Sequence, residues 1–111
     1  MLSTYKFGVI AEYLSVLILK LKMYKIIAIR HRNYFGEIDI IALRNNVIAF
    51  IEVKARASDV GYDLVQQKQI KRIRNAASLF LANHPKYQSK DVRFDLIVII
   101  GISCPKHLQN I

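Results

Sequence analysis

Two acidic residues and a lysine lie in two neighbouring apolar runs, 36–42 and 50–54, that alternate with a period of two. Asp39 is in the first run, and Glu52 and Lys54 are in the second. The segment between the runs contains Asn45 and Asn46, and asparagine tolerates the left-handed backbone of a tight turn. The sequence therefore predicts a β-hairpin that carries all three side chains.

An even-length loop centred between the two asparagines pairs residues whose numbers add up to 91. Asp39 then faces Glu52, and Glu37 faces Lys54. Because side chains alternate along a strand, Asp39, Glu52 and Lys54 share one face of the hairpin. Opposed carboxylates lie roughly 5 Å apart and repel unless a cation lies between them. This pattern indicates a site for a hard divalent cation beside an amine that can handle a proton.

The composition favours one folded domain over residues 1–111 with a polyanionic partner. Of the 111 residues, 53% are hydrophobic, and 17 Lys and Arg against 8 Asp and Glu give a net charge of +9. Such a basic domain favours nucleic acid first and an anionic membrane surface second, while a merely solvated surface is the simpler interpretation. Four of the eight acids lie in or near the proposed site, which argues against solvation alone: Glu12, Glu37, Asp39 and Glu52.

The sequence shows no sign of a disulfide or of a membrane span. Cys104 is the only cysteine, which fits a reducing cytosol. The apolar stretch 9–21 contains Glu12 and Lys20 and is too short to cross a bilayer. We therefore expect a soluble cytoplasmic protein that has no membrane partner.

The first predicted helix begins at Ser3 or Thr4 and runs to about Lys22. Its apolar residues are so numerous that we expect it to be buried on more than one side. Glu12 has two interpretations, a charge that complements the helix dipole or a third carboxylate directed at the hairpin. Spacing alone favours the dipole.

A second helix is predicted to open at Asp63, with Gln66 completing a capping box. It has an apolar stripe for the core: Ile70, Ile73, Ala77 and Phe80. It also has a basic stripe: Lys68, Lys71, Arg72 and Asn75. For one helix alone, a solvated face is the favoured interpretation of the basic stripe.

The remaining strands are predicted over residues 25–32 and 92–102, and the last is almost continuously apolar, as in a strand covered on both faces. The order is then α-β-β-β-α-β. The second helix is long enough to make the strands on either side of it parallel. The predicted α/β fold is a mixed four-stranded sheet flanked by helices, and the segment after Pro105 adds nothing to the prediction.

This arrangement resembles the PD-(D/E)XK, or restriction-endonuclease-like, fold. The chain is more closely similar to the YraN family, small bacterial proteins that resemble archaeal Holliday-junction resolvases. The resemblance covers nearly the whole chain. It rests on Glu12, Arg32, the run 36–39 (Gly-Glu-Ile-Asp), Ile41, Ala42, the run 50–54 (Phe-Ile-Glu-Val-Lys), Arg56, Gly61, Lys68 and the run 93–95 (Arg-Phe-Asp). At two positions where the family has glycine, this chain has Ala11 and Met23.

The resemblance implies a catalytic set of Asp39, Glu52 and Lys54. It implies that Mg²⁺ (or Mn²⁺) is held by the two carboxylates and the carbonyl of Val53, and it promotes Glu12 to an additional metal ligand. The residues expected to bind nucleic acid are Arg32, Arg56, Gln67, Lys68, Lys71 and Arg72.

Three functions remain open at this point. The first is a metal-dependent nuclease that hydrolyses phosphodiester bonds of nucleic acid, expected to be DNA, with branched or damaged DNA among its substrates. The second is a non-catalytic nucleic-acid-binding protein in which basic residues neutralise the two carboxylates. The third is a structural protein whose basic surface docks on an acidic partner. A homodimer is left open as well.

Overall fold

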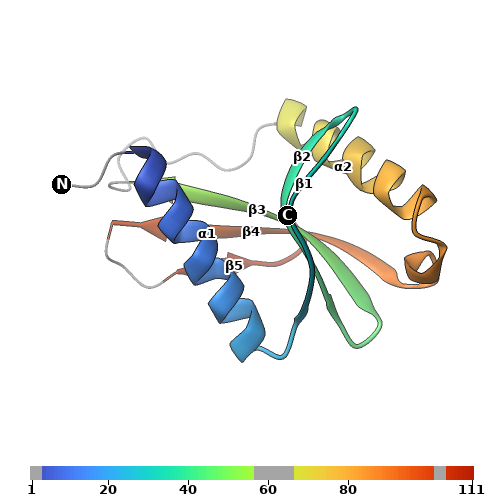
Figure 1. Cartoon of the computed structure of the whole chain (residues 1–111), viewed down its shortest axis with the longest axis horizontal. Coiled ribbons are helices and arrows are strands. Elements are labelled where there is room, and N and C mark those ends of the chain that lie inside the picture. Colours follow the sequence, from blue (N-terminus) through green and yellow to red (C-terminus); the bar gives the residue numbers. More distant parts are fainter. Residues whose placement is uncertain (1–3, 57–66, 102–104) are drawn as a thin grey trace.

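The computed structural model describes residues 4–56, 67–101 and 105–111 of the chain (Figure 1). The described elements are α1 (Thr4–Leu21), β1 (Lys25–Asn33), β2 (Gly36–Arg44), β3 (Val47–Arg56), α2 (Gln67–Ala82), β4 (Asp91–Ile100) and β5 (Lys106–Leu108). A 3-10 turn, Pro85–Tyr87, precedes β4. The strands form one sheet in the order β1-β2-β3-β4-β5.

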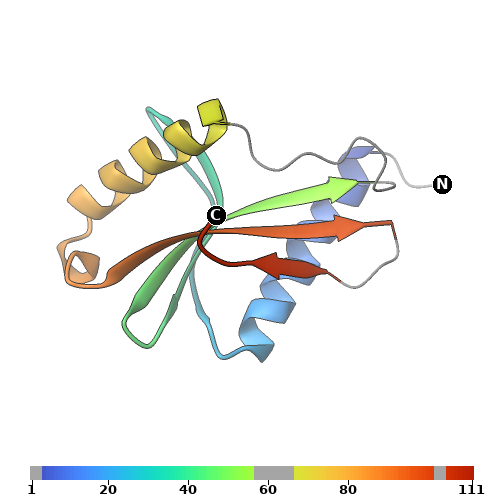
Figure 2. The same cartoon turned by 180° about the vertical axis from the view of Figure 1, so that it is seen from behind.

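The sheet is mixed, as predicted. β3 and β4 are parallel and are connected through α2, whereas the other neighbouring pairs are antiparallel. The helices lie on opposite faces, and α1 is in front of the sheet in Figure 1 and behind it in Figure 2. Alternation along β3 illustrates the two layers, because Ile51 packs in a cluster with Leu19 of α1 while Phe50 packs in one with Phe80 of α2.

The predicted hairpin register is confirmed along most of the β2–β3 ladder. Arg44 pairs with Val47 and Ile40 pairs with Ile51, so the residue numbers add up to 91. Asn45 has a left-handed φ of 54°, in agreement with the reason for placing the turn there. The turn and the apolar alternation together fix which residues of the two strands face each other.

The second helix is confirmed from Gln67 onward, whereas its predicted start at Asp63 lies outside the described residues. In the core stripe, Ile73, Ala77 and Phe80 are buried. The sequence also favours a loop over residues 56–62, which are polar and mixed and include Gly61. At Arg56 this was wrong, because β3 continues to Arg56 in register with β4; residues 57–62 lie outside the described part of the chain.

The prediction of four strands was wrong, because β5 adds a fifth. Leu96 of β4 pairs with Leu108, and Val98 pairs with Lys106. Three residues are too short a segment to show a periodic pattern in the sequence. β5 also covers a β4 edge that would otherwise present unpaired backbone groups.

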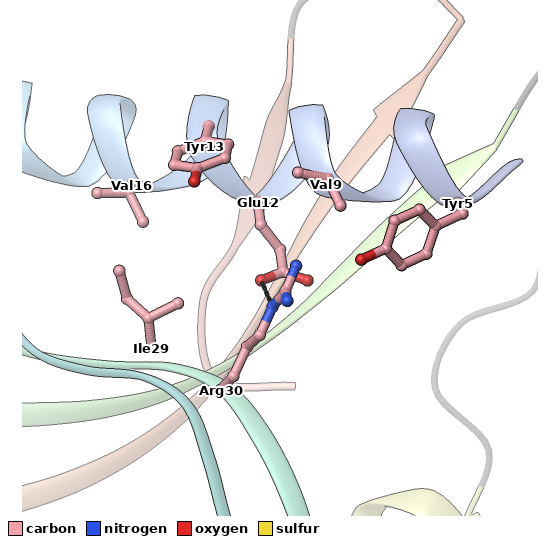
Figure 3. Close-up of a pocket in the computed structure, with 7 residues that line it drawn as sticks. All are labelled: Tyr5, Val9, Glu12, Tyr13, Val16, Ile29 and Arg30. Atoms are coloured by element: carbon pink, nitrogen blue, oxygen red, sulfur yellow. Dashed lines mark hydrogen bonds and ion pairs between the residues drawn. The ribbon is translucent and has the colours of Figure 1, made fainter. Parts of the chain in front are cut away.

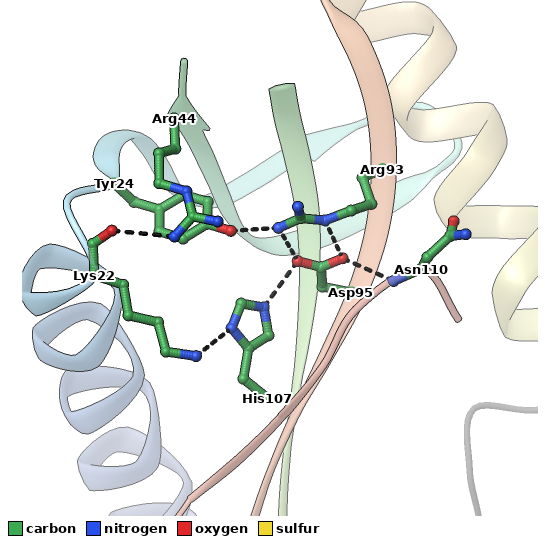
Figure 4. Close-up of polar contacts among 7 residues, drawn as sticks. All are labelled: Lys22, Tyr24, Arg44, Arg93, Asp95, His107 and Asn110. Atoms are coloured by element: carbon green, nitrogen blue, oxygen red, sulfur yellow. Dashed lines mark hydrogen bonds and ion pairs between the residues drawn. The ribbon is translucent and has the colours of Figure 1, made fainter. Parts of the chain in front are cut away.

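A buried carboxylate holds this C-terminal segment against the sheet (Figure 4). Asp95 accepts two hydrogen bonds of 2.8 Å from the guanidinium of Arg93, one of 2.8 Å from Nε2 of His107, and one of 3.1 Å from the backbone N–H of Asn110. Burial acts to raise the pKa of Asp95, but these hydrogen bonds outweigh it and the pKa is lowered. Asp95 therefore joins β4 to β5 as a charged acceptor.

The expectation that α1 is buried on more than one side was wrong. The helix packs against β1, β2 and β3, and its outward residues Ile10, Leu14, Leu17 and Leu21 are 39%, 40%, 54% and 75% exposed. Hydrophobic content alone does not reveal how many neighbours a helix has. No helix within the described ranges combines the length and the apolar character needed to cross a membrane.

α1 ends in a left-handed residue that is not glycine. Met23 has a φ of 70°, its N–H donates to the carbonyl of Lys20, and the N–H of Tyr24 donates to the carbonyl of Leu19 at 2.9 Å. Glycine is preferred at this position because it has no Cβ. The resemblance also predicts a glycine here.

Replacing Met23 by glycine should therefore stabilise the protein by about 0.5–1 kcal/mol. The side chain of Met23 is 81% exposed, so little packing is lost. Met23→Ala is the matched control, because alanine keeps the Cβ and should give almost no gain. The measurement is the free energy of unfolding in urea, and equal effects of the two substitutions would contradict the explanation.

Candidate functional site

The candidate site lies where β2 separates from β3. Their ladder ends at the pair Ile40–Ile51, so the predicted Asp39–Glu52 pair is not a ladder pair. At this position the carboxylate Oδ2 of Asp39 accepts a hydrogen bond of 2.8 Å from the backbone N–H of Val53. Because the strands diverge here, the N–H of Val53 donates to the carboxylate of Asp39 instead of to a backbone carbonyl of β2.

Asp39 and Glu52 form one titrating pair. Burial, followed by the charge of Asp39 and a hydrogen bond to it, raises the pKa of Glu52 to about 8, while Lys54 opposes the shift. Burial also raises the pKa of Asp39, against the hydrogen bonds from Val53 and Glu52. Burial and the repulsion between the two carboxyl groups favour one bound proton on the pair near neutral pH.

Lys54 is the cation beside this pair. Its Nζ lies 4.0 Å from Oε1 of Glu52, and the two side chains are 18% and 20% exposed. The extrapolated register, which sets Lys54 opposite Glu37, offers a cross-strand ion pair as an alternative role for this lysine, and that pair is not formed. Glu37 is opposite Arg32 of β1 and binds its guanidinium at 2.8 Å. Lys54 is therefore directed to the site.

Glu12 lies near the pair but is bound to another residue. Its Oε1 accepts a 2.8 Å hydrogen bond from Nε of Arg30 (Figure 3), and its charge contributes to the raised pKa of Asp39. Among the residues that the structure describes, no three His, Cys, Asp or Glu side chains are grouped so that they could hold a metal ion. The predicted set of three carboxylates is therefore not brought together.

The β1–β2 turn brings the basic face of α2 towards the site. Gly36 has a φ of 148°, and a Cβ on it would lie 2.8 Å from Cδ of Arg72. Asn33 also donates a 2.9 Å hydrogen bond to the carbonyl of Ala76. Gly36 precedes Asp39 by three residues, or about 10 Å along a strand. Glycine is required here by the close approach of Arg72.

The residues predicted to bind nucleic acid have different surroundings. Lys71 and Arg72 are exposed on α2, and the exposed Arg32 is engaged by Glu37. The side chains of the other three lie outside the described residues: Arg56, Gln67 and Lys68. The members of the basic stripe whose side chains the structure describes are therefore exposed.

Arg30 was not singled out from the sequence, although it lies opposite the site. Its φ of 55° is unusual for a residue other than glycine. In the sequence, Arg30 belongs to the run Arg30-His31-Arg32, which indicates only a basic end of a strand. The charge was the one signal for Arg30, because a backbone angle cannot be deduced from the composition of a strand.

The raised pKa of Glu52 predicts a specific pH dependence of stability. Between its ordinary value of 4.5 and about 8, the unfolded chain has lost the proton and the folded chain keeps it. The free energy of unfolding should therefore fall as the pH rises through this window. Glu52→Gln should remove that contribution, so the variant gains on the wild type as the pH rises from 5 to 8, measured by urea unfolding.

Glu37→Gln is the comparison variant for this prediction, because it removes a partly exposed carboxylate from the same strand as Asp39. Its charge is the smallest of the causes that raise the pKa of Glu52, so its stability curve should diverge from that of the wild type far less than the curve of Glu52→Gln. A Glu52→Gln curve parallel to that of the wild type would show that Glu52 titrates alike in the folded and unfolded states.

Comparison with known proteins places the chain among bacterial relatives of uncharacterised function. It is 43% identical to a UPF0102 protein of Bradyrhizobium diazoefficiens over 108 residues, which cover 96% of this chain and 80% of the relative. It is 41% identical to one of Rhizobium meliloti over 111 residues, covering 98% and 90%. It is 44% identical to one of Nitrobacter winogradskyi over 103 residues, covering 91% and 86%.

The profile of the uncharacterised protein family UPF0102 matches residues 11–99, which include Asp39, Glu52, Lys54 and both buried layers. The match therefore spans α1 through β4, and the YraN resemblance noted in the sequence is a resemblance to this same family. This chain belongs to the UPF0102 (YraN) family.

Proposed function

We propose that this protein is a metal-dependent nuclease of restriction-endonuclease-like fold that hydrolyses phosphodiester bonds of nucleic acid, preferentially DNA. The observation that carries the proposal is the proton-sharing pair Asp39 and Glu52, with Nζ of Lys54 4.0 Å from Glu52. Carboxyl groups with raised pKa values beside a lysine, where two strands separate, can act as an acid–base site.

The donor set fits a hard divalent cation. Mg²⁺ is commonly bound by one or two carboxylates together with several waters. Asp39, Glu52 and the carbonyl of Val53 would hold it, and the cation would replace the proton that the pair now shares. We leave Glu12 out of this set because Arg30 occupies its Oε1. When bound, Mg²⁺ or Mn²⁺ would polarise a phosphodiester and lower the pKa of a bound water.

The remaining steps are assigned to side chains of this protein. Lys54 would orient or deprotonate the attacking water, or stabilise the charge that develops on the phosphate. The exposed Lys71 and Arg72 of α2 would position the backbone phosphates, which requires no sequence recognition. The net charge of +9 would attract the polyanion to this face.

The pairing of Arg32 favours this proposal over a non-catalytic nucleic-acid-binding protein. In that alternative, Arg32, Arg56 or Lys54 would neutralise the carboxylates. Arg32 is instead paired with Glu37 at 2.8 Å, Lys54 lies 4.0 Å from Glu52 as a longer ion pair, and the side chain of Arg56 lies outside the described residues. A docking protein for an acidic partner would give no reason to bury two repelling carboxylates.

The first prediction from this proposal concerns the metal. Millimolar Mg²⁺ or Mn²⁺ should raise the melting temperature of the wild type, because a ligand that binds only the folded state stabilises it. The shift should be larger at pH 8 than at pH 6, since the metal competes with the proton on Glu52. Asp39→Asn should be neutral or stabilising without metal and should show no shift with it. An unchanged wild-type melting temperature would exclude the metal site.

The second prediction concerns Lys54. Lys54→Ala should lower the single-turnover cleavage rate by roughly 10²-fold or more while leaving the metal-induced stabilisation in place. The assay uses labelled duplex, four-way junction and single-stranded DNA and RNA with Mn²⁺.

Glu37→Gln is the control for Lys54→Ala, because it breaks the pair with Arg32 without touching the lysine. It should keep most of the activity. Equal and mild effects of the two substitutions would leave Lys54 without a catalytic role. Tight binding without cleavage of any substrate would favour the non-catalytic alternative.

A further inference from the structure

A pocket of about 380 Å³ lies between α1 and β1, on the side of β1 that faces the helix (Figure 3). Val9 and Val16 of α1 and Ile29 of β1 form apolar walls, while Tyr5 and Tyr13 stand at its edges. The two tyrosines are 76% and 72% exposed. The pocket therefore offers flat aromatic surface that no other part of the described chain covers.

The floor of this pocket adjoins the candidate site. The β1–β2 ladder pairs Ile29 with Ile40 and His31 with Ile38. Arg30, between the two pairs, therefore lies opposite Asp39. Neighbouring strands are about 4.8 Å apart. A nucleotide strand at Asp39 would thus have the pocket within reach of an adjacent base.

Arg30 is held in a strained conformation that directs it into the pocket. Its φ of 55° is costly for a residue with a Cβ, and such outliers are concentrated at functional sites. The ion pair with Glu12 at 2.8 Å fixes the guanidinium. The ion pair uses only some of the five N–H donors of the guanidinium. The remaining donors form a polar edge on the floor of the pocket.

The geometry points to an unstacked nucleobase as the ligand of this pocket. We propose that a base adjacent to the scissile phosphodiester leaves its stack and inserts between α1 and β1, with its faces against Tyr5, Tyr13 and the aliphatic walls. Its polar edge meets Arg30 and Glu12. This inference rests on the proposed nuclease function and narrows its substrate class to nucleic acid with unpaired bases at the cleavage point.

The arginines beside the pocket support a base attached to phosphates rather than a free apolar ligand, because their ion pairs with Glu12 and Glu37 leave further guanidinium N–H donors available. Arg30 and Arg32 are two residues apart on β1, and the side chain of Arg32 is 78% exposed. A second groove continues from the pocket past Gly8 to Arg32 and Glu37. A strand could therefore place its phosphates along the arginines while one base occupies the pocket.

The test is a binding measurement with the full chain in EDTA, so that no cleavage occurs. The probes are two DNA duplexes of equal length, one fully paired and one with a three-base bubble that contains 2-aminopurine. The wild type should prefer the bubble, and the 2-aminopurine fluorescence should be quenched on binding. Tyr5→Ala and Tyr13→Ala should each reduce the preference by about tenfold, as expected for loss of stacking on one base.

Tyr34→Ala is the matched control, because this tyrosine is 90% exposed and lies at the β1–β2 turn, away from the pocket. It should leave the preference unchanged. Two tested tyrosines keep the inference falsifiable if one variant fails to fold.

The outcomes separate this inference from the proposed function. Salt-dependent binding of both probes, with a preference that Tyr5→Ala and Tyr13→Ala leave unchanged, overturns the base pocket while the nuclease proposal stands. No binding of either probe by the wild type overturns both. If the tyrosine variants instead lose self-association in sedimentation velocity, the pocket belongs to a second copy of the chain and the inference is wrong.

Discussion

Two carboxyl groups that share a half-buried space cannot both be charged unless a proton or a cation lies between them. Asp39 and Glu52 are in this situation because β2 leaves β3 after the pair Ile40–Ile51. The strand separation leaves the N–H of Val53 without a backbone acceptor, and Asp39 supplies one. The geometry of the sheet and the charge of the site are therefore parts of one arrangement.

The other acids near the sheet are treated differently. Glu12 is bound to Arg30, Glu37 to Arg32, and Asp95 to Arg93, each at 2.8 Å. In contrast to these three ion pairs, the one at the strand separation uses a lysine, whose Nζ lies 4.0 Å from Oε1 of Glu52. A fixed guanidinium would satisfy these carboxylates permanently, whereas a bound proton can be replaced by the metal ion proposed above.

The two helices then divide the remaining tasks. α2 rests on the β1–β2 turn through the contact between Arg72 and Gly36, and its Lys71 and Arg72 are exposed. α1 contributes Glu12, which binds the guanidinium of the left-handed residue Arg30. Membership of UPF0102 extends over all of these elements from residue 11 to residue 99, so the arrangement belongs to the region shared with the relatives.

Local patterns in the sequence determined the hairpin, its register, the core stripe of α2 and the nearness of Asp39 to Glu52. Each of these depends on neighbours in the chain: a turn at Asn45, alternation with a period of two, and helical spacing. The tertiary structure alone decided the fifth strand, the outward apolar face of α1, the burial of Asp95 and the partner of Glu12. The spacing of residues along the sequence predicts which side chains share a face of a helix or strand. The residues that those side chains contact come from segments far away in the chain. For that reason Glu37, opposite Lys54 in the extrapolated hairpin, binds Arg32 of the strand on its other side.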